Sequence, residues 1–426
     1  MQPVLFMTNF RFLHSADNHL DSPLRNLERY DGAPSDKIRN ASREAFEKLI
    51  DLAIADEVSF LLISGDLYDR DVKDHKTGLF IAHQMSRLNQ QGIGVYIIRG
   101  NHDAENQIAK RLSLPDNVHQ FGHKKPETHF IPELKTAIHG QSFAERQVKA
   151  NLAKDYPKGK KDYFNIGMLH SSLSGYAPHE PYAPCSLSDL MEKNYDYWAL
   201  GHVHGFEIVS QKPWVVFPGI PQGRFIKETG TKGCVMVEVQ DNKAVSVRHY
   251  PLDVLRWFLI EADITGAETA REAVEKIYLM VQDKLNENPT LPLALRIIIT
   301  GSCEAHREFQ TDGDLWSANL KSEINDLSSS RVWVEKIRFL TRLPLNIEER
   351  KKAPDILGSF LRSLDLMEQS DDSLETLLSE FSDLNKKLPR ELVEEGNLLT
   401  QNRDDVVELL VEVRNFLTAK LIIHQN

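Results

Sequence analysis

Short apolar runs recur through the first 250 residues, and Gly, Asp, Asn or His bounds each of them. Between the early runs, apolar residues follow helical spacing over Ile38–Ala55 and Gly78–Gln90. Short apolar strands that alternate with helices are typical of a sheet covered by helices, so this pattern predicts an α/β fold. The strands are expected at Phe10–His14, Phe60–Ser64, Val95–Arg99, Phe164–His170 and Tyr197–Gly201.

Helical spacing disappears after Gly205. Three successive strands are predicted there, at Trp214–Phe217, Cys234–Val239 and Ala244–His249. We expect them to form a second sheet that packs on the first. Residues 1–250 are therefore predicted to be one domain, a two-sheet α/β/β/α sandwich.

The rest of the chain divides into two smaller parts. Residues 251–345 are predicted to form a small α+β domain, with strands at Trp257–Asp263, Leu295–Thr300 and Arg331–Phe339 and helices at Glu268–Leu285 and Leu315–Leu327. Residues 346–426 are predicted to be helical, with helices at Pro354–Gln369, Ser373–Leu384 and Asp404–Ile423 and breaks near Asp371 and Pro389.

Composition narrows the class of protein. Of the 426 residues, 41% are hydrophobic and 27% are charged, which is typical of soluble domains. No apolar run reaches the ~18 residues that a membrane-spanning helix needs, and the first residues do not resemble a signal peptide. Cys185, Cys234 and Cys303 are too few and too scattered for a disulfide framework or a thiolate zinc site. We therefore expect a cytoplasmic protein.

The net charge of −11 argues against a protein that coats nucleic acid by charge alone. The excess is uneven, because residues 346–426 hold 17 acidic and 10 basic side chains. The preceding part is nearly neutral and could still bind a polyanion through bound metals and local basic stretches.

Every conspicuous polar cluster in the first 205 residues follows a predicted strand. Ligands bind at such strand ends in α/β sheets, because the loops converge over one edge. Gly65, Gly100 and Gly201 would permit tight turns there. The five clusters are Asp17-Asn18-His19, Gly65-Asp66-Leu67-Tyr68-Asp69, Gly100-Asn101-His102-Asp103, His170-Ser171-Ser172 and Gly201-His202-Val203-His204.

Each cluster taken alone has an ordinary explanation as a turn, a loop or a pair of surface histidines. Together they supply carboxylates, one amide and several imidazoles, and no thiolate. Mixed nitrogen and oxygen donors suit Mn²⁺, Fe²⁺ or Zn²⁺, and seven ligands are enough for two ions that share one carboxylate. The ordered set therefore favours a dinuclear metal site.

In order, these clusters resemble the signature of the calcineurin-like metallophosphoesterases. Within that superfamily the chain is similar to the SbcD-type DNA repair nucleases, and more closely to their bacterial YhaO-like branch. The segment Phe12–Leu24, the pair Pro218-Gly219 and Arg224 carry this closer similarity. The motifs span about residues 10–240, and they are more specific for the superfamily than for DNA.

The resemblance implies a metallophosphoesterase sandwich, a capping domain that contacts DNA and a C-terminal partner-binding segment. It also implies two divalent ions, with Mn²⁺ as the first candidate and Fe²⁺, Zn²⁺ or Mg²⁺ as the others. Seven residues would hold them: Asp17, His19 and His204 on one ion, Asn101, His170 and His202 on the other, and Asp66 bridging both.

His102 would be the imidazole that binds no metal and that either stabilises the charge of the phosphorane or protonates the leaving oxygen, and Asp103 would orient it. Many archaeal and eukaryotic relatives carry His where this chain has Asp69, three residues after the bridging Asp66. Asp69 is thus a weaker candidate for a catalytic role or for a supporting role beside the catalytic residues, with a helix-capping or turn carboxylate as the alternative. Neither cleavage polarity nor endonuclease ability carries over.

Three further features of the sequence each have two possible interpretations. Lys149, Lys154, Lys158, Lys160 and Lys161 could hold a DNA backbone or be solvated loop residues, and Arg224 could meet a phosphate or pair with Glu228. The C-terminal apolar stripe could dock on a coiled-coil ATPase or pack on neighbouring helices. The stripe consists of Val406, Leu409, Leu410, Val413, Phe416, Leu417 and Leu421.

The prediction is a metal-dependent DNA nuclease, an exonuclease in the first instance, that works in DNA repair with an SbcC-like ATPase. The ATPase would bind the C-terminal helices, and a homodimer is expected from the resemblance. One alternative is a small-molecule phosphodiesterase or phosphatase, and another is a non-catalytic scaffold for DNA ends.

Overall fold

The computed structural model describes residues 9–22, 35–69, 75–104, 114–173, 182–329, 331–344, 347–387 and 402–423. Pro23 and Leu24 of the N-terminal motif and the break at Pro389 lie outside the described residues. The side chains of Phe416 and Leu421 in the C-terminal stripe are also outside the description.

The chain forms two compact units. The first comprises residues 1–259, 289–296 and 330–335, and the second comprises residues 260–288, 297–329 and 336–426. This division falls within three strands, so the domain boundaries at residues 250 and 345 stay predictions.

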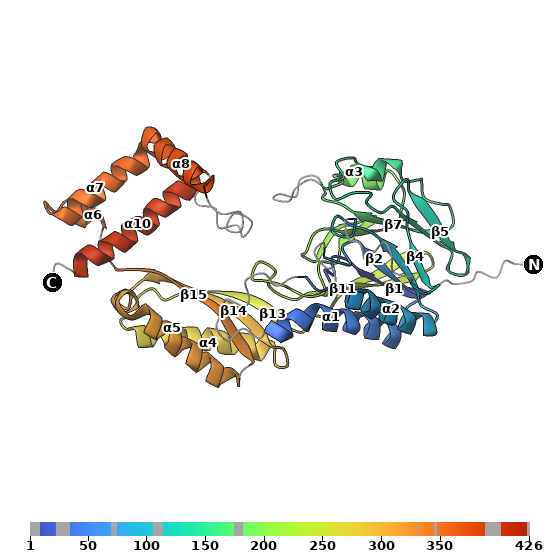
Figure 1. The fold of residues 1–426 in the computed structure, drawn as a ribbon, viewed down its shortest axis with the longest axis horizontal. Helices are drawn as coiled ribbons and strands as arrows, with labels where there is room; N and C mark the ends of the chain where they lie inside the picture. Colours follow the sequence, from blue (N-terminus) through green and yellow to red (C-terminus); the bar gives the residue numbers. More distant parts are fainter. Residues whose placement is uncertain are drawn as a thin grey trace, which may run out of the picture. The chain divides into compact units, whose positions relative to one another are not determined.

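The first sheet has the strand order β12-β11-β1-β2-β3-β4. Its central strands are parallel, whereas β11 pairs antiparallel with both β1 and β12. Helices α1 and α2 cover one face of this sheet (Figure 1). The elements are β1 (Phe10–Ser15), α1 (Ser35–Ala55), β2 (Phe60–Ser64), α2 (His75–Gln90), β3 (Gly94–Ile98), β4 (Val118–Gln120), β11 (Gly233–Gln240) and β12 (Lys243–Pro251).

The second sheet has the strand order β5-β6-β7-β8-β10-β9. Strands β6, β7, β8 and β10 are parallel, and the outer strands β5 and β9 run antiparallel to their neighbours. The elements are β5 (Glu127–Ile131), β6 (Thr136–Gly140), β7 (Phe164–His170), α3 (Leu187–Met191), β8 (Tyr197–Gly201), β9 (Glu207–Gln211) and β10 (Trp214–Phe217).

Aromatic side chains fill the space between the two sheets. Phe12 on β1 stacks on Phe60 of β2, with ring centroids 5.0 Å apart, and meets the edge of Tyr197 on β8 at 5.3 Å. Phe10 contacts the ring of Phe164 on β7 in the same buried cluster. Sheet-on-sheet packing therefore confirms the predicted α/β/β/α sandwich.

The assignment of strands to sheets was wrong in part. The predicted strands at 234–239 and 244–249 extend the first sheet, and only β10 of that trio lies in the second. The second sheet instead contains β7 and β8, together with β5, β6 and β9, which were not predicted. Apolar periodicity identifies a strand but not its partner. β5 and β9 are largely half-exposed, as is the short β4, which was also not predicted. β6 is buried, but only Ala137 and Ile138 in it are apolar.

A three-stranded sheet of order β13-β14-β15 follows, with α4 and α5 on one face (Figure 1). Its elements are β13 (Arg256–Asp263), α4 (Ala270–Glu287), β14 (Leu293–Ser302), α5 (His306–Ser328) and β15 (Val332–Arg342). This α+β arrangement agrees with the prediction, but α5 begins nine residues before the predicted Leu315. Asp312 has a non-helical backbone, which interrupts the helical spacing of apolar residues between the first turns of α5 and the rest of the helix.

The C-terminal helices are α6 (Ile347–Lys351), α7 (Ile356–Gln369), α8 (Asp371–Asn385) and α10 (Arg403–Ile423). Ser370 caps α8 and produces the predicted break near Asp371. Leu364, Leu374, Val406 and Leu410 form a small buried core among α7, α8 and α10. In the C-terminal stripe, Val406 and Leu410 thus pack on neighbouring helices.

Over the described ranges, no helix combines the length and apolar content needed to cross a bilayer.

We expect Phe12→Ala to destabilise the sandwich, because it removes a fully buried ring from the space between the sheets. The free energy of unfolding should fall by ~3–5 kcal/mol, measured by urea denaturation. The control is Val245→Ala on β12, where the residue is 52% exposed and the expected change is within ~0.5 kcal/mol. Equal effects in the two variants would contradict the assigned core.

Candidate metal centre

The loops that follow β1 and β2 are joined by backbone hydrogen bonds. The Asp17 N–H donates to the Gly65 carbonyl at 2.9 Å, and the His19 N–H donates to the Asp66 carbonyl at 3.0 Å. A bridge between Leu20 and Tyr68 continues this pairing. The loops stay side by side because β1 and β2 are parallel neighbours whose carboxyl ends meet at one edge.

Four predicted ligand positions have left-handed backbone conformations. The φ angles are 51° at Asp17, 42° at His19, 52° at Asp66 and 104° at His202. Such conformations are unfavourable for residues other than Gly, at ~1–3 kcal/mol each, and they cluster at functional sites. The surrounding hydrogen bonds and packing must therefore hold these side chains in place.

Close backbone approach explains one of the neighbouring glycines. A Cβ at Gly100 would lie 2.3 Å from Asp66 Oδ1, which is far inside contact distance. Gly100 therefore lets the strand end after β3 come against the Asp66 carboxylate.

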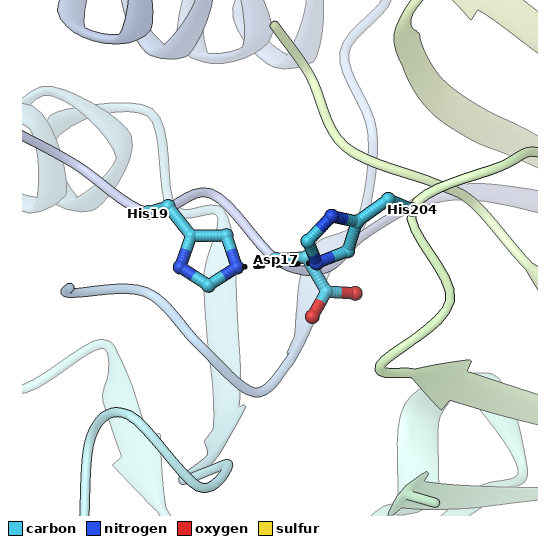
Figure 2. Close-up of side chains that lie close together, drawn as sticks. All are labelled: Asp17, His19 and His204. Carbon is cyan, nitrogen blue, oxygen red and sulfur yellow. Dashed lines mark hydrogen bonds between the residues drawn. The ribbon is translucent and has the colours of Figure 1, made fainter. Parts of the chain in front are cut away.

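Asp17, His19 and His204 converge on one point from the ends of β1 and β8 (Figure 2). One potential ligand atom from each of these residues lies within 4.8 Å of the others. Nε2 of His19 is 3.4 Å from Nε2 of His204, a contact drawn as a dashed line in Figure 2. This grouping is the predicted ligand set of the first ion.

Asp66 connects this group to a second one. Its Oδ2 is 3.9 Å from Nε2 of His19 and 3.6 Å from Nε2 of His170. Nε2 of His170 is also 3.0 Å from Oδ1 of Asn101. The carboxylate thus stands between two imidazoles, as expected for a shared ligand. Asp17, Asp66 and His170 likewise form a group within 4.8 Å.

His202 contacts the cluster through its backbone and through its ring. Its backbone N–H donates to Asp17 Oδ2 at 2.8 Å, and its ring centroid is 5.4 Å from that of His170. The ring of Tyr182 packs against it at 5.2 Å. The structure therefore brings all seven predicted ligands to one edge of the sandwich.

The nitrogen and oxygen atoms of the predicted ligands are suited to binding cations. His170 Nδ1 lies 2.9 Å from the Ser64 carbonyl, which can only accept, so Nδ1 carries the proton and Nε2 presents a lone pair to Asp66. Asp17 Oδ1 is buried and has no hydrogen-bond partner among the described residues. Lone pairs and carboxylates that face one another without protons between them repel unless a cation is present, which makes the cluster suitable for divalent metal ions.

The pKa values reflect the same crowding. Burial, and then the nearby charge of Asp66, raises the pKa of Asp17 well above its usual value. Burial, and then Arg224, lowers the pKa of His19 well below its usual value, and burial also lowers the pKa of His170. Both imidazoles are therefore neutral near pH 7, as metal binding requires.

The predicted partner of His102 was wrong. Nδ1 of His102 is 3.1 Å from Asp69 Oδ1, so Asp69, rather than Asp103, orients this imidazole. Asp69 also accepts a hydrogen bond from Ser22 at 2.6 Å. Burial lowers the pKa of His102, but the hydrogen bond to Asp69 and the charges of Asp66 and Asp69 outweigh it and hold this pKa above its usual value.

Asp103 has a different position. Its carboxylate accepts the backbone N–H groups of Leu67 at 3.2 Å, Tyr68 at 2.8 Å and Gly100 at 3.1 Å. Burial raises the pKa of Asp103 to about 7. Asp103 therefore joins the loops after β2 and β3, and its predicted contact with His102 is replaced by these backbone hydrogen bonds.

Sequence reasoning missed Glu228 as a partner of the site. Its Oε1 lies 2.8 Å from Nδ1 of His204, and Arg224 pairs with the same carboxylate. The Arg224–Glu228 spacing suggested that ion pair, but nothing local connected it to His204.

The five lysines named above are exposed, and Lys160 lies over the rings of Phe130 and Tyr163.

Comparison with known proteins identifies this arrangement. A model of the calcineurin-like phosphoesterases matches residues 10–206, and a model of the middle domain of metallophosphoesterase YhaO matches residues 257–342. The protein named Uncharacterized metallophosphoesterase YhaO of Bacillus subtilis is 35% identical over 303 residues, which cover 70% of this chain and 73% of that protein. The chain belongs to the YhaO branch of the calcineurin-like metallophosphoesterases.

More distant relatives in this family carry the name DNA double-strand break repair protein Mre11. The one from Sulfurisphaera tokodaii is 27% identical over 212 residues, covering 46% of this chain and 50% of that protein. The one from Methanopyrus kandleri is 26% identical over 291 residues, covering 62% and 58%. Family membership makes the chain a metal-dependent phosphoesterase of the hydrolase class.

We expect Asp66→Asn to weaken metal binding strongly, because it removes the charge that stands between the two histidine groups. The dissociation constant for Mn²⁺ should rise by more than ~100-fold, since losing even an outer contact of a ligand costs ~10–100-fold. Isothermal titration of the metal-free protein measures it. Asp56→Asn, at a surface pair with Arg11, serves as the control, and equal affinities in both variants would refute the site.

Proposed function

We propose that this metallophosphoesterase is a DNA nuclease, an exonuclease in the first instance, that hydrolyses phosphodiester bonds at a dinuclear site and acts in DNA repair. The observation that carries the proposal is the convergence of the complete ligand set at one sheet edge. The similarity to proteins named for DNA double-strand break repair supports DNA as the substrate class.

In this proposal one ion is held by Asp17, His19 and His204 and the other by Asn101, His170 and His202. Asp66 is shared by the two ions. The close distances from Asp66 to His19 and His170 support that role. The mixed nitrogen and oxygen donors suit Mn²⁺ first, with Fe²⁺, Zn²⁺ or Mg²⁺ as alternatives.

Divalent ions bound here would supply positive charge that offsets the charge of the phosphodiester and favours ionisation of water near neutral pH. The protein's own contribution is to position mostly buried donor side chains and to move a proton. His102 is suited to that task because Asp69 accepts its Nδ1–H and thereby orients Nε2. Its raised pKa favours the protonated form, which can donate to the leaving oxygen.

We expect His102→Ala to lower Mn²⁺-dependent cleavage of labelled duplex DNA by ~10²–10⁴-fold, the usual contribution of a positioned acid. The Mn²⁺ stoichiometry should stay as in the wild type, because His102 is assigned no metal. The control is His83→Ala, an exposed histidine on α2. Full cleavage by His102→Ala would contradict the assigned role.

The same assay separates the competing functions of the wild-type protein. Faster turnover of a small nucleotide phosphodiester than of duplex DNA would favour a small-molecule phosphodiesterase. Absence of Mn²⁺-dependent cleavage on any substrate would favour a non-catalytic scaffold for DNA ends.

We further propose that the C-terminal helices bind an SbcC-like coiled-coil ATPase and that the nuclease works as a homodimer. Exposed apolar residues support the first point, because Ile356 and Leu366 on α7 are 73% and 70% exposed. Leu366→Asp should abolish co-purification with a coexpressed ATPase of this class and leave cleavage of a small phosphodiester unchanged. Unaltered co-purification would argue against α7 as the contact.

A further inference from the structure

The Glu228 carboxylate is buried, and its two oxygens accept four hydrogen bonds. Oε1 accepts from His204 Nδ1 and from Arg224 Nη2, both at 2.8 Å. Oε2 accepts from the backbone N–H of Arg224 at 2.8 Å and from its Nε at 3.3 Å. All four partners are donors, which only an ionised carboxylate can satisfy at once.

This arrangement determines which nitrogen of His204 carries the proton. Because a carboxylate only accepts, Nδ1 of His204 must be protonated, and in the neutral imidazole Nε2 is left with its lone pair. That Nε2 is the atom that faces His19 Nε2 at 3.4 Å.

Arg224 extends the contact to the other side of the site. Its Nη1 lies 3.8 Å from Asp69 Oδ2, and Asp69 accepts from Nδ1 of His102. The guanidinium therefore stands between two carboxylates, each of which orients a histidine. The side-chain contacts thus run from His204 through Glu228, Arg224 and Asp69 to His102.

We propose that Glu228 and Arg224 are positioning residues of the metal centre: Glu228 holds His204 in the tautomer that presents Nε2 to a metal ion, and Arg224 links Glu228 to the Asp69–His102 pair. This inference rests on the proposed role of His204 as a ligand. The arrangement matches a general feature of metal sites, in which a carboxylate fixes the orientation and basicity of a ligating imidazole.

The geometry argues against direct substrate binding by Arg224. Two of its side-chain nitrogens are hydrogen-bonded to Glu228, and the third is directed at Asp69. A phosphate would have to compete with both carboxylates for the same guanidinium N–H groups. Positioning and substrate binding predict different kinetics, which allows a test.

The first experiment uses Glu228→Gln in the full-length, metal-free protein. The Gln amide nitrogen must replace one carboxylate oxygen, so its N–H groups face two of the four donors. The substitution also removes the negative charge that favours a proton on His204 Nδ1, without loss of side-chain volume. The dissociation constant for Mn²⁺ should rise by ~10–100-fold. The ¹⁵N shifts of the His204 ring should change from a pure Nδ1–H form to a mixture of tautomers, an effect that a purely structural role would not produce.

Glu238→Gln is the matched control, because Glu238 pairs with Arg248 in the sandwich away from the site and loses the same charge. His204→Ala is the reference for ligand loss. If His204→Ala weakens Mn²⁺ binding but Glu228→Gln leaves both affinity and tautomer unchanged, the positioning role is refuted and the metal site stands. If neither variant changes Mn²⁺ affinity, the assignment of His204 itself is wrong.

Arg224→Lys provides a second, independent test. Lys keeps the positive charge, but its single ammonium group cannot reach the Glu228 and Asp69 carboxylates together, as the planar guanidinium group does. We expect a fall in kcat on a small phosphodiester and an increase in the Mn²⁺ dissociation constant, each ~10-fold, with KM for the substrate within twofold of the wild type. A raised KM with unchanged kcat and Mn²⁺ affinity would show that Arg224 binds the phosphate instead.

Discussion

The repulsion among buried electron-pair donors at one edge of the sandwich is the constraint on which this structure depends. Asp66 Oδ2 lies close to the Nε2 atoms of both His19 and His170, and Asp17 is buried in the same group. Away from water such groups are unfavourable unless a proton or a cation compensates them. The raised pKa of Asp17 reflects this conflict, which bound divalent ions would resolve.

The fold opposes that repulsion with rigid neighbours. Strands β1 and β2 hold two of the ligand-bearing loops together, and the aromatic layer between the sheets brings the ends of β7 and β8 to the same edge. Left-handed backbone at Asp17, His19 and Asp66 is maintained by this framework. Burial of the core thus stabilises a site that would be unfavourable on an isolated loop.

Two histidines at this site have the same kind of partner but different proposed tasks. His204 and His102 each place Nδ1 against a carboxylate, that of Glu228 and that of Asp69. Nε2 of His204 lies 3.4 Å from Nε2 of His19, whereas His102 joins His19 and Asp69 in a separate group of potential ligand atoms. In our proposal the first carboxylate–imidazole pair holds a metal ligand and the second holds a proton donor.

The sequence by itself determined the strands that carry the polar clusters, and it identified all seven residues that the structure brings together. Those signals are local, because apolar runs and the residues next to them are neighbours in the chain. Only the tertiary structure decided that β11 pairs with β1, that Asp69 rather than Asp103 contacts His102, and that Glu228 contacts His204. Each of these contacts joins segments distant in sequence, and their geometry depends on how the two sheets pack.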